Sequence, residues 1–218
     1  IRFLIMVCLI SAGYARANDL YNKYNVSVSG VKIGVFTWNL KLQGNKYSSE
    51  IYLNDSGMLS ALYNFEGSYV SKGIFKDNVF KSESYKQRWE TNKKIKIVEI
   101  TFDQYPEKIY QQPVEKEAPR LEIDELFQYF DPVTSFINIL SGGNEAKTID
   151  GRRVYIMKNT NSSKDGKITI EISNYRNIWA DHKRNDLKKI VFFPSENNIF
   201  PSKLIIFFKD RVFKLEQV

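Results

Sequence analysis

Alternation of apolar and polar residues with a period of two runs through most of this sequence, and it limits the fold more than any other feature. Phe36, Trp38 and Leu40 fall on one face of such a run, and the isoleucines of 168–172 alternate with Thr and Glu in another. Successive side chains of a strand point to opposite faces of a sheet, so the pattern is typical of half-buried strands. Turn residues such as Gly44-Asn45 separate the runs, of which there are about ten.

Three runs depart from simple alternation. Residues 93–104 change phase at Val98, which indicates either a bulge or a strand covered on both faces. The stretches 190–193 and 204–208 are continuously apolar, and we expect both faces of these strands to be covered. The charged, proline-containing stretch 105–120 is expected to be a surface loop.

One segment has helical rather than strand periodicity. Asp131-Pro132 has the residue types of an N-cap and a first helical position, and Ser141-Gly142-Gly143 has those of a helix end. The spacing of apolar residues predicts a helix over 132–141, and helix-like spacing over 123–130 predicts a second turn or short helix. The apolar stripe at helical spacing consists of Val133, Phe136, Ile137 and Leu140.

Length and composition favour one well-buried domain. The chain has 218 residues, of which 43% are hydrophobic and 14% aromatic, and this is too apolar for a disordered chain. Strands and helices do not alternate, which disfavours a doubly wound sheet. Twist accumulates across a sheet of about ten strands, which makes it curl. We therefore expect a mainly β fold, in which a single long curved antiparallel sheet, a half-open barrel, wraps one or two short helices.

Residues 1–17 have the pattern of a signal peptide. An apolar run over 3–10 is followed by Ala15-Arg16-Ala17, which fits a cleavage site after Ala17. The alternative is an N-terminal membrane anchor, but about 12 apolar residues are fewer than the roughly 20 that a span needs. We expect a periplasmic protein whose mature part, 18–218, forms one domain.

The rarity of two residue types excludes several kinds of site. The chain has one Cys and one His, too few for a cysteine zinc site, an Fe–S cluster, a multi-histidine metal site or a disulfide scaffold. Asp181-His182 has no G-x-S-x-G nucleophile to serve. The carboxylates of 115–125 fit a solvated surface better than the paired acids of a hydrolase. We expect no cofactor, no metal and no enzymatic activity, with a hydrolase as the least favoured alternative.

Basic residues outnumber acidic ones, with 32 Lys and Arg against 25 Asp and Glu and a formal charge of +7. They gather in three clusters, Lys93-Lys94-x-Lys96, Arg152-Arg153 and a third over 183–189. Such clusters attract anionic lipid head groups or acidic envelope glycans, or they merely solvate strands and turns. Export disfavours nucleic acid as a partner. Arg152 follows the turn residues Asp150-Gly151, so we expect it to pair locally.

Several short motifs together resemble those of an uncharacterised family of exported proteobacterial proteins, classed only as a domain of unknown function. They are YNVSVSGVKIG over 24–34, Phe102-Asp103, DPVTS over 131–135, IDGRRVY over 149–155 and FPSKL over 200–204. The family-like residues within them are Asp131, Ser135, Asp150, Gly151, Arg152, Arg153 and Pro201. Such proteins are similar in outline to periplasmic lipoprotein carriers, whose half-open β-barrel is lidded by helices and holds acyl chains. The resemblance implies an exported protein with a curved sheet, and fold does not by itself carry function.

Two functions follow from these expectations. The first is a non-catalytic protein that binds an apolar or lipid-like envelope ligand in the concave face of its sheet. The alternative is an envelope structural or interaction protein that meets a partner protein or glycan and whose own helix fills the concavity. Partner and oligomeric state stay open. The candidate ligand contacts are Phe36, Trp38, Leu40, Trp89 and Phe136.

Overall fold

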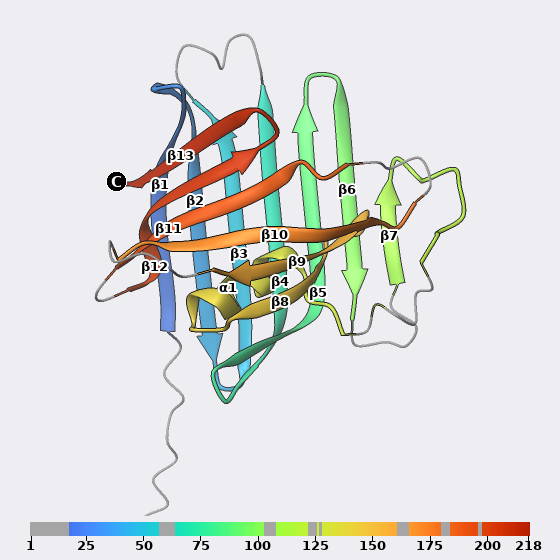
Figure 1. Ribbon diagram of the computed structural model, residues 1–218, viewed down its shortest axis with the longest axis horizontal. Helices are drawn as coiled ribbons and strands as arrows, with labels where there is room; N and C mark the ends of the chain where they lie inside the picture. The colour runs from blue at the N-terminus through green and yellow to red at the C-terminus, as the bar shows by residue number, and fades with distance from the viewer. Residues whose placement is uncertain are drawn as a thin grey trace, which may run out of the picture.

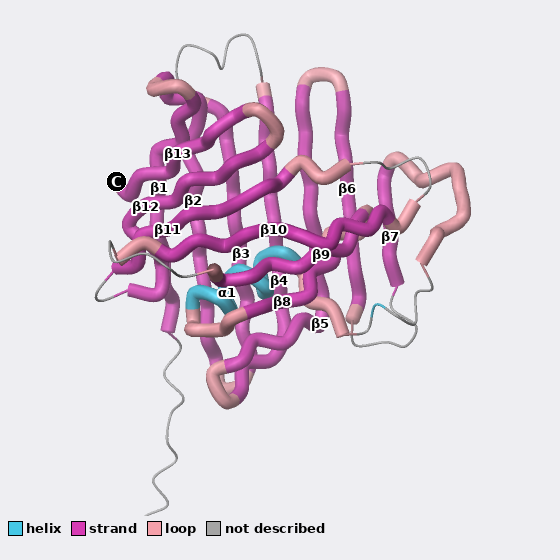
Figure 2. The backbone as a smooth tube through the Cα atoms, in the orientation of Figure 1, coloured by secondary structure: helices cyan, strands magenta, loops and turns pink. Residues whose placement is uncertain are grey.

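The computed structural model confirms a mainly β fold built on one antiparallel sheet (Figure 1). It describes residues 18–56, 64–102, 108–121, 126, 128–160, 166–179, 184–195 and 198–218. Thirteen strands and one helix form within these ranges, and Figure 2 shows how little of the traced chain is helical. The predicted signal peptide lies outside the described residues, as does half of the short helix expected over 123–130, namely 123–125 and 127.

The first half of the chain forms seven strands that follow one another in the sheet. They are β1 (Asn18–Val28), β2 (Val31–Gln43), β3 (Lys46–Asp55), β4 (Phe65–Lys76), β5 (Val79–Thr91), β6 (Lys94–Thr101) and β7 (Lys108–Gln112). The stretch expected to be a loop over 105–120 therefore contains a short strand. Ile109 of β7 pairs with Ile100 of β6, so this alternating segment extends the sheet by one edge strand.

The second half begins with the helix α1 (Pro132–Leu140) and continues with six strands. They are β8 (Glu145–Ile149), β9 (Arg153–Asn159), β10 (Ile168–Asn177), β11 (Leu187–Ser195), β12 (Asn198–Phe208) and β13 (Arg211–Gln217). The count exceeds the predicted ten because β7 and β8 are short. β10 continues through a polar segment to Asn177.

The two halves join in the middle of the sheet. Every strand pairs with its neighbours in sequence, except that β7 and β8 do not pair with each other and that β1 also pairs with β13, where Val26 lies opposite Leu215. β7 and β8 are consequently the two outer edges. Figure 1 shows the strands of the second half crossing over those of the first half, so the curved sheet forms two walls with an interior between them.

Strand alternation decides which side chains reach this interior. On β6, Val98 and Ile100 are buried, whereas Ile95 is 40% exposed on the outer face. The pairing of β6 with β5 and β7 continues without a register shift. The phase change at Val98 therefore marks neither a bulge nor a strand covered on both faces. The outer face of β6 has apolar residues that are partly open to solvent.

Lysine side chains cover part of the apolar outer face of the second half. On β11 and β12, Phe192 and Leu204 are buried in the interior, while Phe193 and Phe207 lie half-buried on the other face. The Lys189 ammonium lies 4.6 Å from the centre of the Phe207 ring. The expected covering of both faces thus comes from long charged side chains and not from a second layer.

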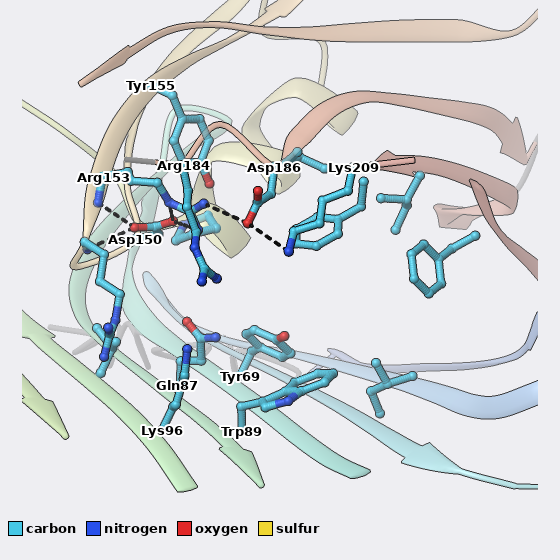
Figure 3. A pocket seen from close by; sticks show the side chains of 18 of the residues that line it. Tyr69, Gln87, Trp89, Lys96, Asp150, Arg153, Tyr155, Arg184, Asp186 and Lys209 are labelled. Carbon is cyan, nitrogen blue, oxygen red and sulfur yellow. Dashed lines mark hydrogen bonds and ion pairs between the residues drawn. The ribbon is translucent and has the colours of Figure 1, made fainter. Parts of the chain in front are cut away.

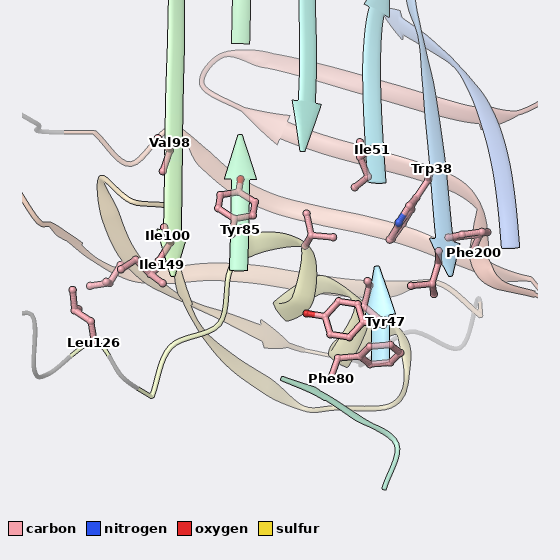
Figure 4. Packing of buried hydrophobic residues seen from close by; sticks show 14 of the residues in the cluster. Trp38, Tyr47, Ile51, Phe80, Tyr85, Val98, Ile100, Leu126, Ile149 and Phe200 are labelled. Atoms are coloured by element: carbon pink, nitrogen blue, oxygen red, sulfur yellow. The ribbon is translucent and has the colours of Figure 1, made fainter. Parts of the chain in front are cut away.

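The helix α1 lies inside the curve of the sheet and fills one end of the interior (Figure 4). Asp131 caps it through the backbone N–H groups of Val133 and Thr134, and Pro132 occupies the first turn, as the sequence predicts. Ile137 is fully buried. The Asn138 amide also exchanges two hydrogen bonds with the backbone of Phe80, which ties the helix to β5. No helix among the described residues is long and apolar enough to cross a membrane.

Candidate functional site

The other end of the interior contains a cavity of about 560 Å³ between the two walls (Figure 3). This volume lies within the roughly 300–1,000 Å³ that small-molecule sites occupy. Pro132, the first residue of α1, marks the boundary between the filled end and the cavity. The cavity is therefore the part of the concave face that the helix leaves open.

Apolar side chains from both walls line the inner part of the cavity. They come from β1, β3, β11, β12 and β13, so strands from both halves of the chain contribute. These residues are Val26, Leu53, Leu187, Ile206, Phe208, Phe213 and Leu215. Val26 and Leu215 are buried, whereas Leu53 and Phe213 keep part of their surface open. A ligand with an apolar body could cover that remaining surface.

Two aromatic residues of the first wall, Tyr69 on β4 and Trp89 on β5, also face the cavity (Figure 3). Trp89 lies over Gly67, where an added Cβ would approach the indole ring to 2.9 Å, and it stacks on Phe65 with ring centres 5.7 Å apart. Gly67 thus makes room for the indole. Burial raises the pKa of Tyr69 to about 12, so its hydroxyl stays neutral.

The three basic clusters of the sequence converge at the polar part of the cavity. Lys96 of β6, Arg152 and Arg153 at the start of β9, and Arg184 just before β11 all line it. Lys209, which follows β12, also lines the cavity. Figure 3 shows Arg184 reaching from the second wall towards Gln87 and Lys96 on the first. Residues that are 56 and 88 positions from Lys96 along the chain therefore surround one space.

Carboxylates neutralise three of these five cations. Arg153 donates to Asp150 through Nη2 at 2.7 Å and through Nε at 2.9 Å. Asp186 lies 3.9 Å from both Arg153 Nη1 and Lys209 Nζ. The remaining pair joins Arg152 Nη1 to Glu115 Oε1 at 2.7 Å, and both side chains are largely buried.

Lys96 and Arg184 make no ion pair with any residue that the structure describes. Arg184 is exposed and Lys96 is half-buried. Desolvation lowers the pKa of the Lys96 ammonium, and repulsion from Arg152 and Arg184 lowers it further. The polar part of the cavity thus has an excess of positive charge.

The family-like turn from Asp150 to Arg153 joins the two outer edges of the sheet. Asp150 Oδ1 accepts the backbone N–H groups of Arg152 at 2.9 Å and Arg153 at 2.8 Å, which closes the turn. Gly151 has a φ of +82°, and an added Cβ would lie 2.2 Å from Val98 Cγ1 on β6. Its carbonyl accepts from Gln111 Nε2 of β7 at 2.8 Å. Glycine at this position lets the turn approach the opposite wall.

The expected local pairing of Arg152 is wrong for its side chain. Arg153 is the residue that pairs with Asp150, while the Arg152 guanidinium reaches Glu115 beyond β7. This long-range pair adds a second link between the edges of the sheet. Arg152 Nη2 is buried without a hydrogen-bond partner among the described residues.

The other family-like motif lies at the filled end. Asp131 Oδ2 accepts hydrogen bonds from Thr134 Oγ1, from Ser71 Oγ at 2.8 Å and from Ser82 Oγ at 2.6 Å. Burial raises the pKa of the Asp131 carboxyl, although these bonds oppose the shift. Ser135 accepts from Thr148 of β8 at 2.8 Å. The motif therefore fixes α1 to β4, β5 and β8, and Pro132 is its one residue in the cavity lining.

Of the five predicted ligand contacts, the cavity lining includes Trp89 alone. Leu40 and Trp38 are 0% and 1% exposed in the core, and Phe136 of α1 stacks on Trp38 with ring centres 5.8 Å apart. Phe36 packs edge-on against the same indole. The four other candidates therefore sit in the packed part of the interior, because α1 covers the face that they share.

Other candidate residues have structural positions or lie outside the described ranges. The Pro201 carbonyl accepts the Tyr24 hydroxyl at 2.7 Å in the core. Asp181-His182 and the acidic residues over 122–125 fall on parts of the chain that the structure does not describe. Within the described ranges, no group of three or more His, Cys, Asp or Glu is placed to hold a metal ion.

Four lining residues were not predicted from the sequence, namely Leu53, Phe213, Gln87 and Lys209. Their positions on alternating strands showed only that they face inward or stand beside a turn. Clustering of basic residues was the one available signal, and it included Lys96 and Arg184.

Comparisons with known proteins support the fold. Residues 23–183 match a family described as "Protein of unknown function (DUF3108)". The structure is similar to that of a beta-barrel-like protein of a domain of unknown function, DUF1849, from Brucella abortus, with a TM-score of 0.52, 8% sequence identity, and coverage of 91% of this chain and 95% of that one. At this identity the likeness concerns the fold alone. No curated protein matches the chain in sequence.

Proposed function

The chain belongs to the DUF3108 family, and we propose that it binds an apolar, lipid-like ligand of the cell envelope in the cavity between the two walls of its sheet. The observation that carries this proposal is the cavity of about 560 Å³, whose inner part is lined by apolar residues from both halves of the chain. The ligand would be bound and not transformed.

The packing of the rest of the interior supports a ligand site. Protein interiors are normally packed about as tightly as organic crystals, with few voids larger than a water molecule. At the filled end this holds, since Ile137 and Leu40 are fully buried. At the open end, Leu53, Trp89 and Phe213 keep part of their surface uncovered around a space that both walls enclose. A bound apolar ligand would bury that surface.

A periplasmic location is part of the proposal. It is supported by the signal-peptide pattern of residues 1–17 and the predicted cleavage after Ala17. There, a cavity of this kind would screen the apolar part of an envelope lipid from water.

Calorimetric titration with 1-monolauroylglycerol, a neutral molecule with one alkyl chain, tests the binding proposal. We expect saturable binding with one molecule per chain and a negative heat-capacity change, the mark of apolar burial. Leu53→Trp fills the cavity and should abolish binding. Tyr52→Trp is the matched control, because Tyr52 precedes Leu53 on β3 and is 41% exposed on the outer face.

Absence of binding to the unaltered chain, both of this neutral molecule and of an anion with the same acyl chain, would overturn the proposal. So would equal binding by Leu53→Trp and Tyr52→Trp, since the alkyl chain would then lie elsewhere. Thermal unfolding of both variants shows whether they remain folded at the titration temperature.

The alternative is an envelope interaction protein whose concavity is filled by its own helix, and the buried position of α1 favours it in part. Val133, Ile137 and Ile139 of this helix are buried in the core. The helix has only nine residues, however, and the cavity extends beyond its first residue. Ligand binding explains both ends of the interior, whereas the alternative explains the filled end alone.

A further inference from the structure

Resting on the proposed function, we infer that the ligand is an acidic single-chain amphiphile, whose anionic head group binds between Lys96 and Arg184 while its alkyl chain lies against Leu53 and Phe213. All four residues line the same cavity. The inference goes beyond apolar binding because it assigns a polar subsite and a charge to the ligand.

The balance of charge at the cavity favours an anionic head group. Five cations line it, and Asp150, Asp186 and Glu115 are the carboxylates that pair with three of them. Lys96 and Arg184 remain, with no carboxylate at ion-pair distance among the described residues. An anionic head group would supply the missing negative charge, whereas a cationic one would be repelled.

The positions of Lys96 and Arg184 on opposite walls also favour a head group between them. Lys96 belongs to β6 in the first wall, and Arg184 precedes β11 in the second, so a head group between them would be held from both sides (Figure 3). Gln87 lies on the first wall beside Lys96 and offers an uncharged N–H donor. Charged donors that converge on one anion give hydrogen bonds about twice as strong as neutral ones.

Holding these cations close together without an anion is electrostatically unfavourable. Desolvation and repulsion from Arg152, Arg184 and Lys94 lower the pKa of Lys96, and attraction to Glu115 opposes this shift only in part. Partial burial keeps solvent from screening this repulsion fully. A bound anion would relieve it, so this subsite is better suited to a charged ligand than to an empty or neutral state.

Trp89 and Tyr69 lie on the same wall as Lys96 and Gln87, and they lead from the cations to the apolar lining (Figure 3). Aromatic rings with one polar atom are suited to such a boundary, because one end contacts an alkyl chain and the other can meet a head group. The cavity therefore combines the two chemical surfaces of an amphiphile in one continuous space.

Titration with dodecanoate and with 1-monolauroylglycerol at the same ionic strength tests the inference, since the two carry the same twelve-carbon acyl group and differ in the charge of the head. We expect dodecanoate to bind about tenfold more tightly or better, the value of one charged hydrogen bond. Lys96→Gln and Arg184→Gln should each lower dodecanoate affinity by about tenfold and leave the neutral molecule unaffected.

Lys86→Gln is the matched control for these variants. Lys86 lies between the cavity residues Tyr85 and Gln87 on β5, but it is exposed on the outer face and pairs with Glu99 at 2.6 Å. The Lys86→Gln substitution removes the same unit of charge without altering the cavity, so dodecanoate affinity should stay within about twofold of the unaltered chain.

Each outcome decides a separate point. If the neutral molecule binds as tightly as dodecanoate, or if Lys96→Gln and Arg184→Gln behave like Lys86→Gln, the anionic subsite is wrong while the proposed function stands. If neither molecule binds, the proposed function fails and the subsite fails with it. Tighter binding of dodecanoate that both cavity variants lose supports the inference.

Discussion

The two ends of the interior are enclosed by the same sheet, yet one is packed and the other is hollow. At the packed end, Ile137 and Asp131 of the helix region are completely buried. At the hollow end, Leu53 and Trp89 face a cavity of about 560 Å³. Strand alternation sends apolar side chains inward at both ends. The difference shows that the short helix, and not the strands, determines which part of the concave face remains available.

The two ends also treat charge differently. The packed end contains a buried carboxylate, Asp131, which is surrounded by the hydroxyl groups of Ser71, Ser82 and Thr134. The hollow end has cations in excess, with Lys96 and Arg184 open to a ligand. A polar group in a closed interior needs fixed partners, whereas a group beside a cavity can exchange water for a ligand. We therefore assign a structural role to the polar groups of the packed end and ligand binding to those of the hollow end.

The largest expected effect is on stability at the packed end. Ile137→Ala removes a fully buried side chain of α1 and should lower the free energy of unfolding by about 2–5 kcal/mol. Leu53→Ala is the matched cavity variant, and it should cost less than half as much because Leu53 already faces open space. Urea denaturation measures both. Equal losses of stability would show that the two ends are packed alike, which contradicts the difference described above.

A smaller effect is expected where the hollow end is closed. Gly151→Ala combines a positive φ of +82° with a Cβ 2.2 Å from Val98, whereas Gly44→Ala, at φ +58°, meets nothing within 4 Å. Left-handed strain alone costs about 1–2 kcal/mol, which is what Gly44→Ala should lose. Gly151→Ala should lose more and should also weaken ligand binding, because the turn holds the two edges of the sheet together.

Urea unfolding and calorimetric titration of these two variants provide the measurement. A Gly151→Ala variant that is no less stable than Gly44→Ala would contradict the close contact between the turn and β6. The comparison would then need another explanation for how the cavity is enclosed on that side.

The smallest effect concerns pH. The pKa of Asp131 is raised in the folded chain, so the folded state binds its proton more tightly than the unfolded state does. This contribution is fully present below the ordinary carboxyl pKa of 3.8 and is lost as pH rises through the folded value. The stability of Asp131→Asn relative to the unaltered chain should therefore increase with pH over that interval.

Urea denaturation at a series of pH values from 3 to 8 checks this sign, because the series then begins below the ordinary carboxyl pKa values of 3.8 for Asp131 and 4.5 for Glu216. Glu216→Gln is the control, because the hydrogen bond from Lys203 lowers the pKa of that exposed carboxyl and predicts the opposite pH dependence. Exposed pairs are screened by solvent, so its slope should also be weaker. A flat difference between Asp131→Asn and the unaltered chain would mean that the hydroxyl groups compensate fully for burial.

Local signals in the sequence were sufficient for most of the elements, with β7 and β8 as exceptions, but not for their assembly. Asp131-Pro132 specified the start of the helix because capping depends on neighbouring residues alone. The pairing of β1 with β13, in contrast, joins Val26 to Leu215, and no local pattern encodes such a distant contact. Without that pairing, the two walls and the space between them could not be derived.

The site was harder to predict for the same reason. Trp38 and Trp89 both lie on strands, and the sequence does not distinguish their surroundings. In the structure, α1 covers Trp38 and leaves Trp89 at the cavity. Lys96 and Arg184 were visible only as members of two basic clusters. Their convergence depends on the crossing of the two halves of the sheet, which a one-dimensional pattern does not contain.

A crystal structure of the complex with dodecanoate would test the account most directly. We expect the alkyl chain along Leu53 and Phe213, the carboxylate within hydrogen-bond distance of Lys96 and Arg184, and the packed end around Ile137 unchanged. Dodecanoate bound on the outer face of the sheet, or a cavity occupied by the protein's own side chains, would contradict the division of the interior into a packed end and a binding end.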